Sequence, residues 1–223
     1  MARDAWEDGL TKPEAPPVRF VKVHDAHTIN SAGKPVLGGS AGAHGAIVIV
    51  RDPRDVAPSL AHQYDLSIDE AIAFMHDEDR ALSNTKSAQD SQFRQKLRGW
   101  SGHVTSWLDQ KDIPIHLIRY EELRQDTPGT LSRALAFAGV SVAVETINRA
   151  VAAGDFEVLR ELEQQKGFVE APRRGTTFFR RGEVGAWRDE LTRDQVMKLE
   201  ARHWQTMLRL GYRLSHSNLA RAG

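Results

Sequence analysis

Arginines in the 223-residue sequence stand at positions where they could bind an anion. Arg51 directly follows the apolar run 46–50, and Ser59 lies eight residues further on. The planar guanidinium of an arginine can donate two parallel hydrogen bonds to a phosphate, and a serine hydroxyl can add a third. The structural alternative is that Arg51 pairs with Asp52 or Asp55 and binds no ligand.

A second candidate anion site is the run Arg180, Arg181 and Gly182. Two guanidiniums stand here beside a glycine, whose backbone N–H an anion can approach closely because no side chain covers it. The alternative interpretation is a solvated basic loop without a ligand.

His24 is the candidate for proton transfer, and Lys22 precedes it by two residues. The apolar composition of residues 18–23 predicts a short strand, on which Lys22 and His24 would share one face. The alternative is an ordinary half-buried histidine. His27 adds a second imidazole, but a metal site needs more ligands than this pair supplies, so we expect no metal.

The elements around Arg51 predict how it is positioned. The run 46–50 is rich in β-branched residues and predicts a strand buried on both faces, as in a parallel sheet. Asp52 followed by Pro53 predicts an N-cap and the first helical position. Ligands of open parallel sheets bind at the carboxyl ends of strands, beside helix N-termini. Pro58 is expected to kink this helix or to delay its start.

Further strands and helices complete an α/β pattern. Residues 113–119 predict a strand that leads into Tyr120, for which the alternative role is capping the sheet. Helices are predicted over residues 67–76, 93–110, 130–138, 141–165 and 194–210, the fourth being broken at Gly154 and Asp155. Phe156 follows that break. It could contact a ligand, or it could be an ordinary side chain of the hydrophobic core. The glycine-rich stretch 32–45 precedes a strand, so we expect a connection and not a nucleotide-binding loop.

Composition limits the classes of function. Thirty Lys and Arg balance thirty Asp and Glu, which argues against a nucleic-acid partner. The absence of cysteine excludes disulfides, thiol nucleophiles and thiolate metal sites. The N-terminal residues lack the pattern of a signal peptide, and no apolar run reaches membrane-spanning length. We therefore expect a cytoplasmic protein.

These separated elements, in this order, resemble those of the PAPS-dependent sulfotransferase family. The resembling stretches are VKVHDA at 21–26 (family K-[TS]-H), RDPRDVAPS at 51–59 (R-[ND]-P-[KR]-D-x-x-x-S), RYEEL at 119–123 ([RF]-Y-E-[DE]-[LM]), DFEVLR at 155–160 (S-F-x-x-[ML]-[RK]) and RRGEVGAWRD at 180–189 (R-K-G-x-x-G-D-W-[KR]-N). The chain departs from the family at Val23, where a small hydroxylated residue is usual, and at Ala186, where an aspartate is usual.

The resemblance implies an α/β fold related to nucleotide kinases, with a parallel sheet flanked by helices. It also implies transfer of a sulfonate from PAPS (3′-phosphoadenylyl sulfate) to a hydroxyl or amine of a small molecule, which leaves PAP. The implied roles are general base for His24, charge stabilisation for Lys22, binding of the 3′-phosphate for Arg51, Ser59, Arg180, Arg181 and Gly182, stacking on adenine for Phe156, and a nearby nucleotide contact for Tyr120.

The resemblance covers residues 18–214, with a polar lead-in at 1–17 and a tail at 215–223 that we expect to be disordered. The family's 5′-phosphosulfate loop, [YF]-P-[KR]-[ST]-G-[TS]-[TS]-W, has no counterpart before His24, so we expect an N-terminally shortened chain. A strand missing from the sheet would leave an unpaired edge through which copies could form a homo-oligomer. The alternatives are a non-catalytic relative that binds PAP or serves as an interaction module and, more remotely, an adenylate-type kinase.

Overall fold

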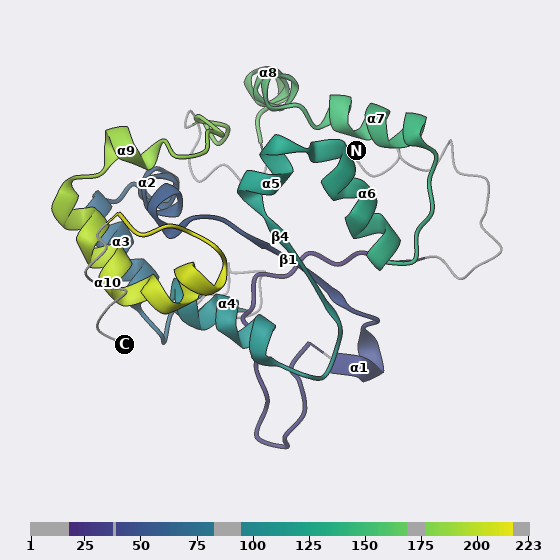
Figure 1. Cartoon of the computed structure of the whole chain (residues 1–223), viewed down its shortest axis with the longest axis horizontal. Coiled ribbons are helices and arrows are strands. Elements are labelled where there is room, and N and C mark those ends of the chain that lie inside the picture. The colour runs from purple at the N-terminus through teal and green to yellow at the C-terminus, as the bar shows by residue number, and fades with distance from the viewer. Residues whose placement is uncertain (1–17, 38, 83–94, 169–176, 216–223) are drawn as a thin grey trace.

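A computed structural model describes residues 18–37, 39–82, 95–168 and 177–215 (Figure 1). The helices in this part of the chain are α1 (Gly39–Gly42), α2 (Pro53–Tyr64), α3 (Ile68–His76), α4 (Trp100–Asp109), α5 (Tyr120–Gln125), α6 (Thr127–Phe137), α7 (Val144–Ala153), α8 (Phe156–Lys166), α9 (Trp187–Glu190) and α10 (Arg193–Arg209). The strands are β1 (Ala46–Val50), β2 (Ala81–Leu82), β3 (Gln95–Lys96) and β4 (Ile115–Arg119).

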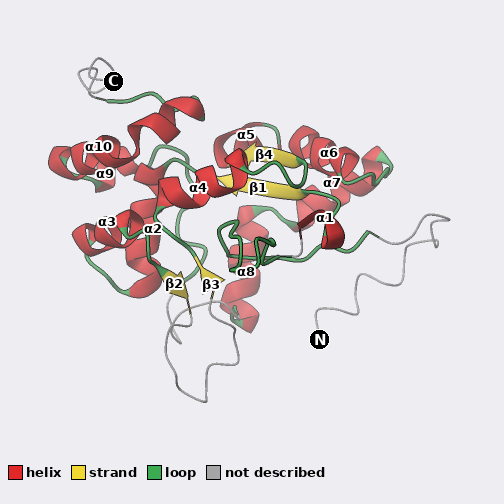
Figure 2. Ribbon diagram, turned by 90° about the horizontal axis from the view of Figure 1, so that it is seen from below, coloured by secondary structure: helices red, strands yellow, loops and turns green. Residues whose placement is uncertain are grey.

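Strands β1 and β4 form a parallel pair in the register Ala46↔Ile115 to Val50↔Arg119. Figure 1 shows this pair running between α5 and α6 on one side and α4 and α10 on the other. Val48 and Val50 point into the main core, together with Trp107 of α4 and Met207 of α10. The predicted α/β architecture, with parallel strands flanked by helices, is confirmed. Figure 2 shows the short antiparallel pair β2–β3 apart from these strands.

The expectation that strand 46–50 is buried on both faces is wrong. Ile49, which points away from the main core, is 61% exposed, whereas its register partner Ile118 on β4 is buried. Helix α6 packs against β4 on this side of the sheet, and its cover does not extend to Ile49.

Helix α2 begins where its sequence predicts. The side chain of Asp52 accepts a hydrogen bond of 2.9 Å from the backbone N–H of Arg54, and Pro53 occupies the first turn. The expected delay of the helix start at Pro58 is wrong, because α2 starts at Pro53 and includes Pro58. Pro58 is the sixth residue of α2 and removes only the bond to the carbonyl of Arg54, and the helix continues past it to Tyr64.

The strand predicted over residues 18–23 is wrong. This segment has no strand structure, and its apolar side chains are exposed. Apolar composition favours a strand only where a neighbouring strand can pair with it. The chain is instead held just afterwards, where the indole N–H of Trp107 donates to the carbonyl of Asp25 at 3.0 Å and the N–H of Ala26 donates to the carbonyl of Lys96 at 2.7 Å.

The long helix predicted over residues 93–110 begins only at Trp100. Arg98 has a φ of 63°, which no right-handed helix allows, and residues 95–96 pair with residues 81–82 instead.

The remaining helices follow their sequence signals. Ser67 and Glu70 form the expected capping box of α3. The predicted break at Gly154 and Asp155 separates α7 from α8, and the side chain of Asp155 caps α8. Within the described ranges, none of the helices combines the length and the apolar character needed to cross a bilayer.

Candidate functional site

A pocket of about 570 Å³ opens where β1 and β4 end. Its walls come from α2, from α5, from the start of α8 and from the loop that leads to α9. All seven residues predicted to bind the nucleotide line it: Arg51, Ser59, Tyr120, Phe156, Arg180, Arg181 and Gly182. The structure thus brings together residues from four segments that are far apart in the sequence.

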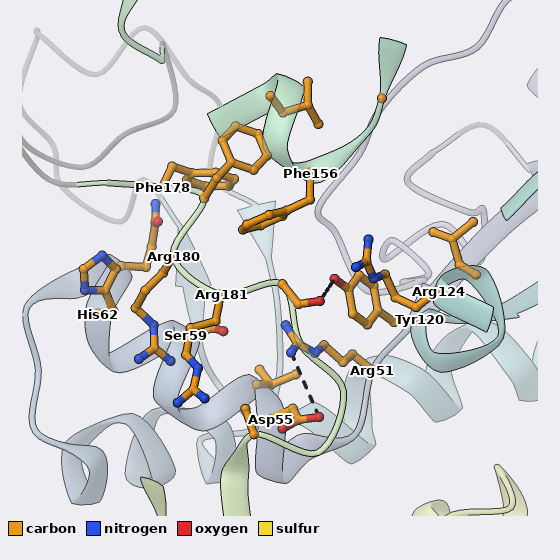
Figure 3. A pocket seen from close by; sticks show the side chains of 18 of the residues that line it. Arg51, Asp55, Ser59, His62, Tyr120, Arg124, Phe156, Phe178, Arg180 and Arg181 are labelled. Atoms are coloured by element: carbon orange, nitrogen blue, oxygen red, sulfur yellow. Dashed lines mark hydrogen bonds and ion pairs between the residues drawn. The ribbon is translucent and has the colours of Figure 1, made fainter. Parts of the chain in front are cut away.

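Figure 3 shows the arrangement of these side chains: Arg51 and Tyr120 lie on one side of the pocket, Arg180 and Arg181 on the other, and Phe156 lies across the space from them. Arg124, one helical turn after Tyr120, also lines the pocket and was missed by the sequence analysis.

Arg51 is held by contacts that leave part of its guanidinium available. Its Cζ lies 4.5 Å from the centroid of the Tyr120 ring, and its Nη2 donates to the backbone carbonyl of Glu183 at 2.5 Å. The Nη2 is 4.0 Å from the carboxylate of Asp55, which makes a long ion pair. The Nε is buried without a hydrogen-bond partner among the described residues. A buried donor without an acceptor is costly, and an anion in the pocket would satisfy it.

The carboxylate of Asp55 connects α2 to the loop before α9. Its two oxygens accept hydrogen bonds from the backbone N–H groups of Gly185, at 2.7 Å, and Trp187, at 3.0 Å. Asp55 is only 3% exposed. Its main partners are therefore backbone groups, and this role was missed by the sequence analysis.

A buried ionic cluster connects the start of α2 to α10 and to Trp187. Arg54 pairs with Asp52 at 2.6 Å and with Glu200 of α10 at 2.7 Å, and its Cζ lies 4.3 Å from the centroid of the Trp187 ring. Burial lowers the pKa of Arg54, but the two carboxylates outweigh burial and the net pKa is raised. Arg54 therefore stays charged and fixes α2 against α10 and Trp187.

Arg180 and Arg181 are paired with carboxylates of the same segment. Arg180 makes two contacts with Glu190, Nη1 to Oε2 at 2.7 Å and Nη2 to Oε1 at 2.9 Å. Arg181 contacts Glu183 at 2.7 Å and Glu190 at 3.4 Å. The hydrogen bonding of Arg181, which donates to the carboxylate of Glu183, is the main reason why the pKa of Arg181 is raised.

The backbone of Gly182 lies close against the ring of Phe156. Its φ is +63°, and a Cβ built on it would lie 2.6 Å from two ring atoms of Phe156. The hydroxyl of Tyr120 donates to the carbonyl of Gly182 at 2.8 Å (Figure 3). Only glycine allows this backbone conformation and this contact together.

Glu163 of α8 holds the other end of the same loop. Its carboxylate accepts from the backbone N–H groups of Phe178, at 2.5 Å, and Phe179, at 3.0 Å. Together with Asp55, it fixes both ends of the segment that contains Arg180 to Gly182. No local sequence signal predicts this contact, since Glu163 lies in an ordinary run of polar helical residues.

The structure does not bring the predicted catalytic pair into this pocket. Lys22 and His24 are exposed, and neither lines it. His24 lies near His103 of α4. The pKa of His103 is lowered mainly by burial, and the charge of His24 lowers it by a smaller amount. The roles of Lys22 and His24 remain predictions from sequence.

Comparison with known proteins gives a match over most of the chain. A family model described as the sulfotransferase domain matches residues 45–211. Human sulfotransferase 2B1 is 28% identical over 158 residues, which are 66% of this chain and 40% of that protein. Rat sulfotransferase 2A6 is 26% identical over 97 residues, 42% of this chain and 34% of that protein. The chain thus spans less than half the length of these relatives.

Solved structures share its fold. Retinol dehydratase in complex with androsterone and the inactive cofactor PAP superimposes with a TM-score of 0.61 at 22% identity, over 92% of this chain and 57% of that one. Mouse sulfotransferase SULT7A1 complexed with PAP gives a TM-score of 0.56 at 21% identity, over 80% and 63%. A complex of retinol dehydratase with retinol and PAP gives 0.53 at 22% identity, over 73% and 47%.

Proposed function

The chain belongs to the sulfotransferase family, and from that premise we propose that it transfers a sulfonate group from PAPS to a small molecule and leaves PAP. One observation carries the proposal: the residues that the family motifs select for the nucleotide, from four separate segments, all line one pocket. Its volume of about 570 Å³ is within the usual range for small-molecule sites.

The chemistry of the pocket fits the nucleotide. Arg51, Arg180 and Arg181 would hold the 3′-phosphate, with Ser59 and the N–H of Gly182 as further donors. The buried Nε of Arg51 lacks an acceptor among the described residues, which supports an anion at this position. The aromatic rings of Phe156 and Tyr120 would form the adenine part of the site.

PAPS supplies an activated sulfonate when bound, so the work of the protein is positioning and charge stabilisation. His24 would accept the proton of the attacking hydroxyl or amine, and Lys22 would stabilise negative charge near the transferred group. These two roles rest on the sequence motif, because neither residue lines the nucleotide pocket.

We propose a small-molecule acceptor with a hydroxyl or amine group. The retinol dehydratase complexes contain androsterone or retinol together with PAP, which supports this class in a related fold.

A second candidate function is binding of PAP without catalysis. The exposed position of Lys22 and His24, outside the pocket, favours it. Both candidates use the same nucleotide pocket, so turnover separates them.

The experiment is titration calorimetry with PAP and with 5′-AMP, followed by transfer assays with labelled PAPS and a panel of hydroxyl and amine acceptors. Tighter binding of PAP than of AMP, together with labelled product, would support the transferase. Preference for PAP without product from any acceptor would favour the non-catalytic alternative. Equal or absent binding of both nucleotides would overturn the nucleotide site.

A further inference from the structure

The carboxylate of Glu190 pairs with Arg180 and Arg181, two of the predicted phosphate ligands. We propose that Glu190 is an internal competing anion, which occupies Arg180 and Arg181 and must be displaced by the 3′-phosphate of the nucleotide. Glu190 therefore lowers the affinity of the site for PAP. This inference rests on the proposed function and names a further residue that determines its affinity.

The contacts of Glu190 are those of a bound anion. Its two oxygens face the two terminal nitrogens of Arg180 at 2.7 and 2.9 Å, the parallel geometry by which a guanidinium binds a carboxylate or a phosphate. One of the same oxygens lies 3.4 Å from Arg181. Among the described residues, Glu190 is the one carboxylate that pairs with both arginines. It also lines the pocket itself.

The other carboxylates near the pocket are placed differently. Asp55 is buried and accepts two backbone hydrogen bonds, so it is part of the framework. The carboxylate of Glu183 pairs with Arg181 and not with Arg180, and its side chain is more than half exposed to water. Glu190 is mostly covered, so its pairing is less screened than that of Glu183.

A nucleotide phosphate can displace this carboxylate. Glu190 is the last residue of the four-residue helix α9, where its side chain can turn away without breaking a long helix. A phosphate monoester carries more negative charge than a carboxylate and offers three acceptor oxygens, enough for both guanidiniums. Arg51 lines the same pocket with a side chain that is about one-fifth exposed, and it offers the phosphate a first contact. The nucleotide must break the ion pairs of Glu190 with the two arginines when it binds, so its affinity is lower by the free energy of those pairs.

The variant Glu190→Gln removes the competing charge and keeps the size of the side chain. We expect PAP to bind about tenfold more tightly to this variant, or about 1.4 kcal/mol, by titration calorimetry. AMP, which lacks the 3′-phosphate, should bind as it does to the parent chain. The control is Glu157→Gln, which breaks an exposed pair with Arg160 on α8 and should leave both affinities unchanged.

A second measurement tests whether Glu190 affects PAP binding through Arg180. In an Arg180→Ala background, Glu190→Gln should give little further gain, because its main partner is already absent. Unchanged or weaker PAP binding by Glu190→Gln, in a chain that still prefers PAP to AMP, would overturn the inference and leave the proposed function intact. An equal gain for AMP would also overturn it. Failure of every form to prefer PAP would overturn the proposed function and this inference together.

Discussion

The carboxylate of Asp55 accepts a hydrogen bond of 3.0 Å from the backbone N–H of Trp187, which lies 132 residues later in the chain. Its other oxygen accepts from Gly185 at 2.7 Å. Arg51 is one turn before Asp55, and the segment 180–182 ends three residues before Gly185. This single side chain therefore sets the distance between the two predicted halves of the phosphate site.

We predict that Asp55→Ala lowers both stability and nucleotide affinity. The change leaves two largely buried backbone N–H groups without their acceptor, which should lower the free energy of unfolding by roughly 2–4 kcal/mol. Urea unfolding followed by tryptophan fluorescence measures the first effect, and PAP titration the second. The control Asp69→Asn, on the exposed face of α3, should unfold like the parent chain. If Asp55→Ala unfolds at the same urea concentration as the parent chain, the two hydrogen bonds of Asp55 contribute nothing to stability.

Gly182→Ala should strongly weaken PAP binding. The added Cβ would lie 2.6 Å from the ring of Phe156, so the ring or the loop must move. Gly33 provides a matched control, because its φ of +74° is similar but a Cβ there meets nothing within 4 Å. Both alanine variants should lose roughly 1–2 kcal/mol of stability from the unfavourable φ. Only Gly182→Ala should also lose PAP affinity, by about tenfold or more; equal affinities in the two variants would contradict the assigned contact.

Local signals were sufficient where the chemistry is local. Asp52 and Pro53 correctly predict where α2 begins, and the capping box of Ser67 and Glu70 correctly predicts where α3 begins. The strand 46–50 was predictable from its run of β-branched residues. The seven pocket residues were found because they occur in motifs, and the structure shows that these motifs meet.

Errors arose where the outcome depends on distant partners. Residues 18–23 have strand-like composition but no neighbouring strand in the described structure, and the exposure of Ile49 depends on where α6 packs. Asp55 and Glu163 both accept hydrogen bonds from backbone N–H groups of the loop, and Asp55 does so across 130 residues of sequence. A pattern of side chains cannot predict such contacts. In this chain the sequence motifs predicted residues that share one pocket, but they did not predict the framework contacts around it.

Arg51→Lys should weaken PAP binding although it preserves the charge. Lysine cannot donate in the planar fork geometry and would lose the stacking of the guanidinium on Tyr120. We expect a loss of roughly 1–2 kcal/mol for lysine and roughly 1.5–3 kcal/mol for alanine, measured by calorimetry. Arg209→Ala, which removes an exposed pair with Asp109, serves as the control. Parental affinity in Arg51→Ala would remove Arg51 from the site.

His24→Ala should lower the rate of sulfonate transfer by about 10²–10⁴-fold, the usual contribution of a positioned general base. Affinity for PAP should be unchanged, because His24 does not line the nucleotide pocket. His44, another exposed histidine, is the matched control, and His44→Ala should retain the parental rate. Near-parental turnover by His24→Ala would exclude this residue as the base.

His203 provides a group whose titration should be visible in the stability of the protein. It is 1% exposed on α10, and its ring meets Trp100 and His76 edge-on at centroid distances of 5.3 and 5.1 Å. Its Nδ1 lies 2.8 Å from the hydroxyl of Ser101. Burial, together with the smaller effects of the nearby charges of His76 and Arg202, lowers the pKa of His203 to about 3.

We predict that the protein loses stability as the pH falls below about 6.5, where an unfolded histidine takes up a proton. Between that pH and about 3 the unfolded state binds a proton that folded His203 does not, so the free energy of unfolding decreases as the pH is lowered. From pH 7.5 to 5.5 the linkage amounts to about 1.4 kcal/mol from His203 alone, and burial of His76, whose pKa is also lowered, adds to it. The variant His203→Asn keeps a polar group near Ser101 but cannot titrate, so its urea midpoint should change less over this range. His44→Ala should keep the parental pH dependence. An equal loss of stability in His203→Asn and the parent chain would show that His203 is not the source of the pH dependence.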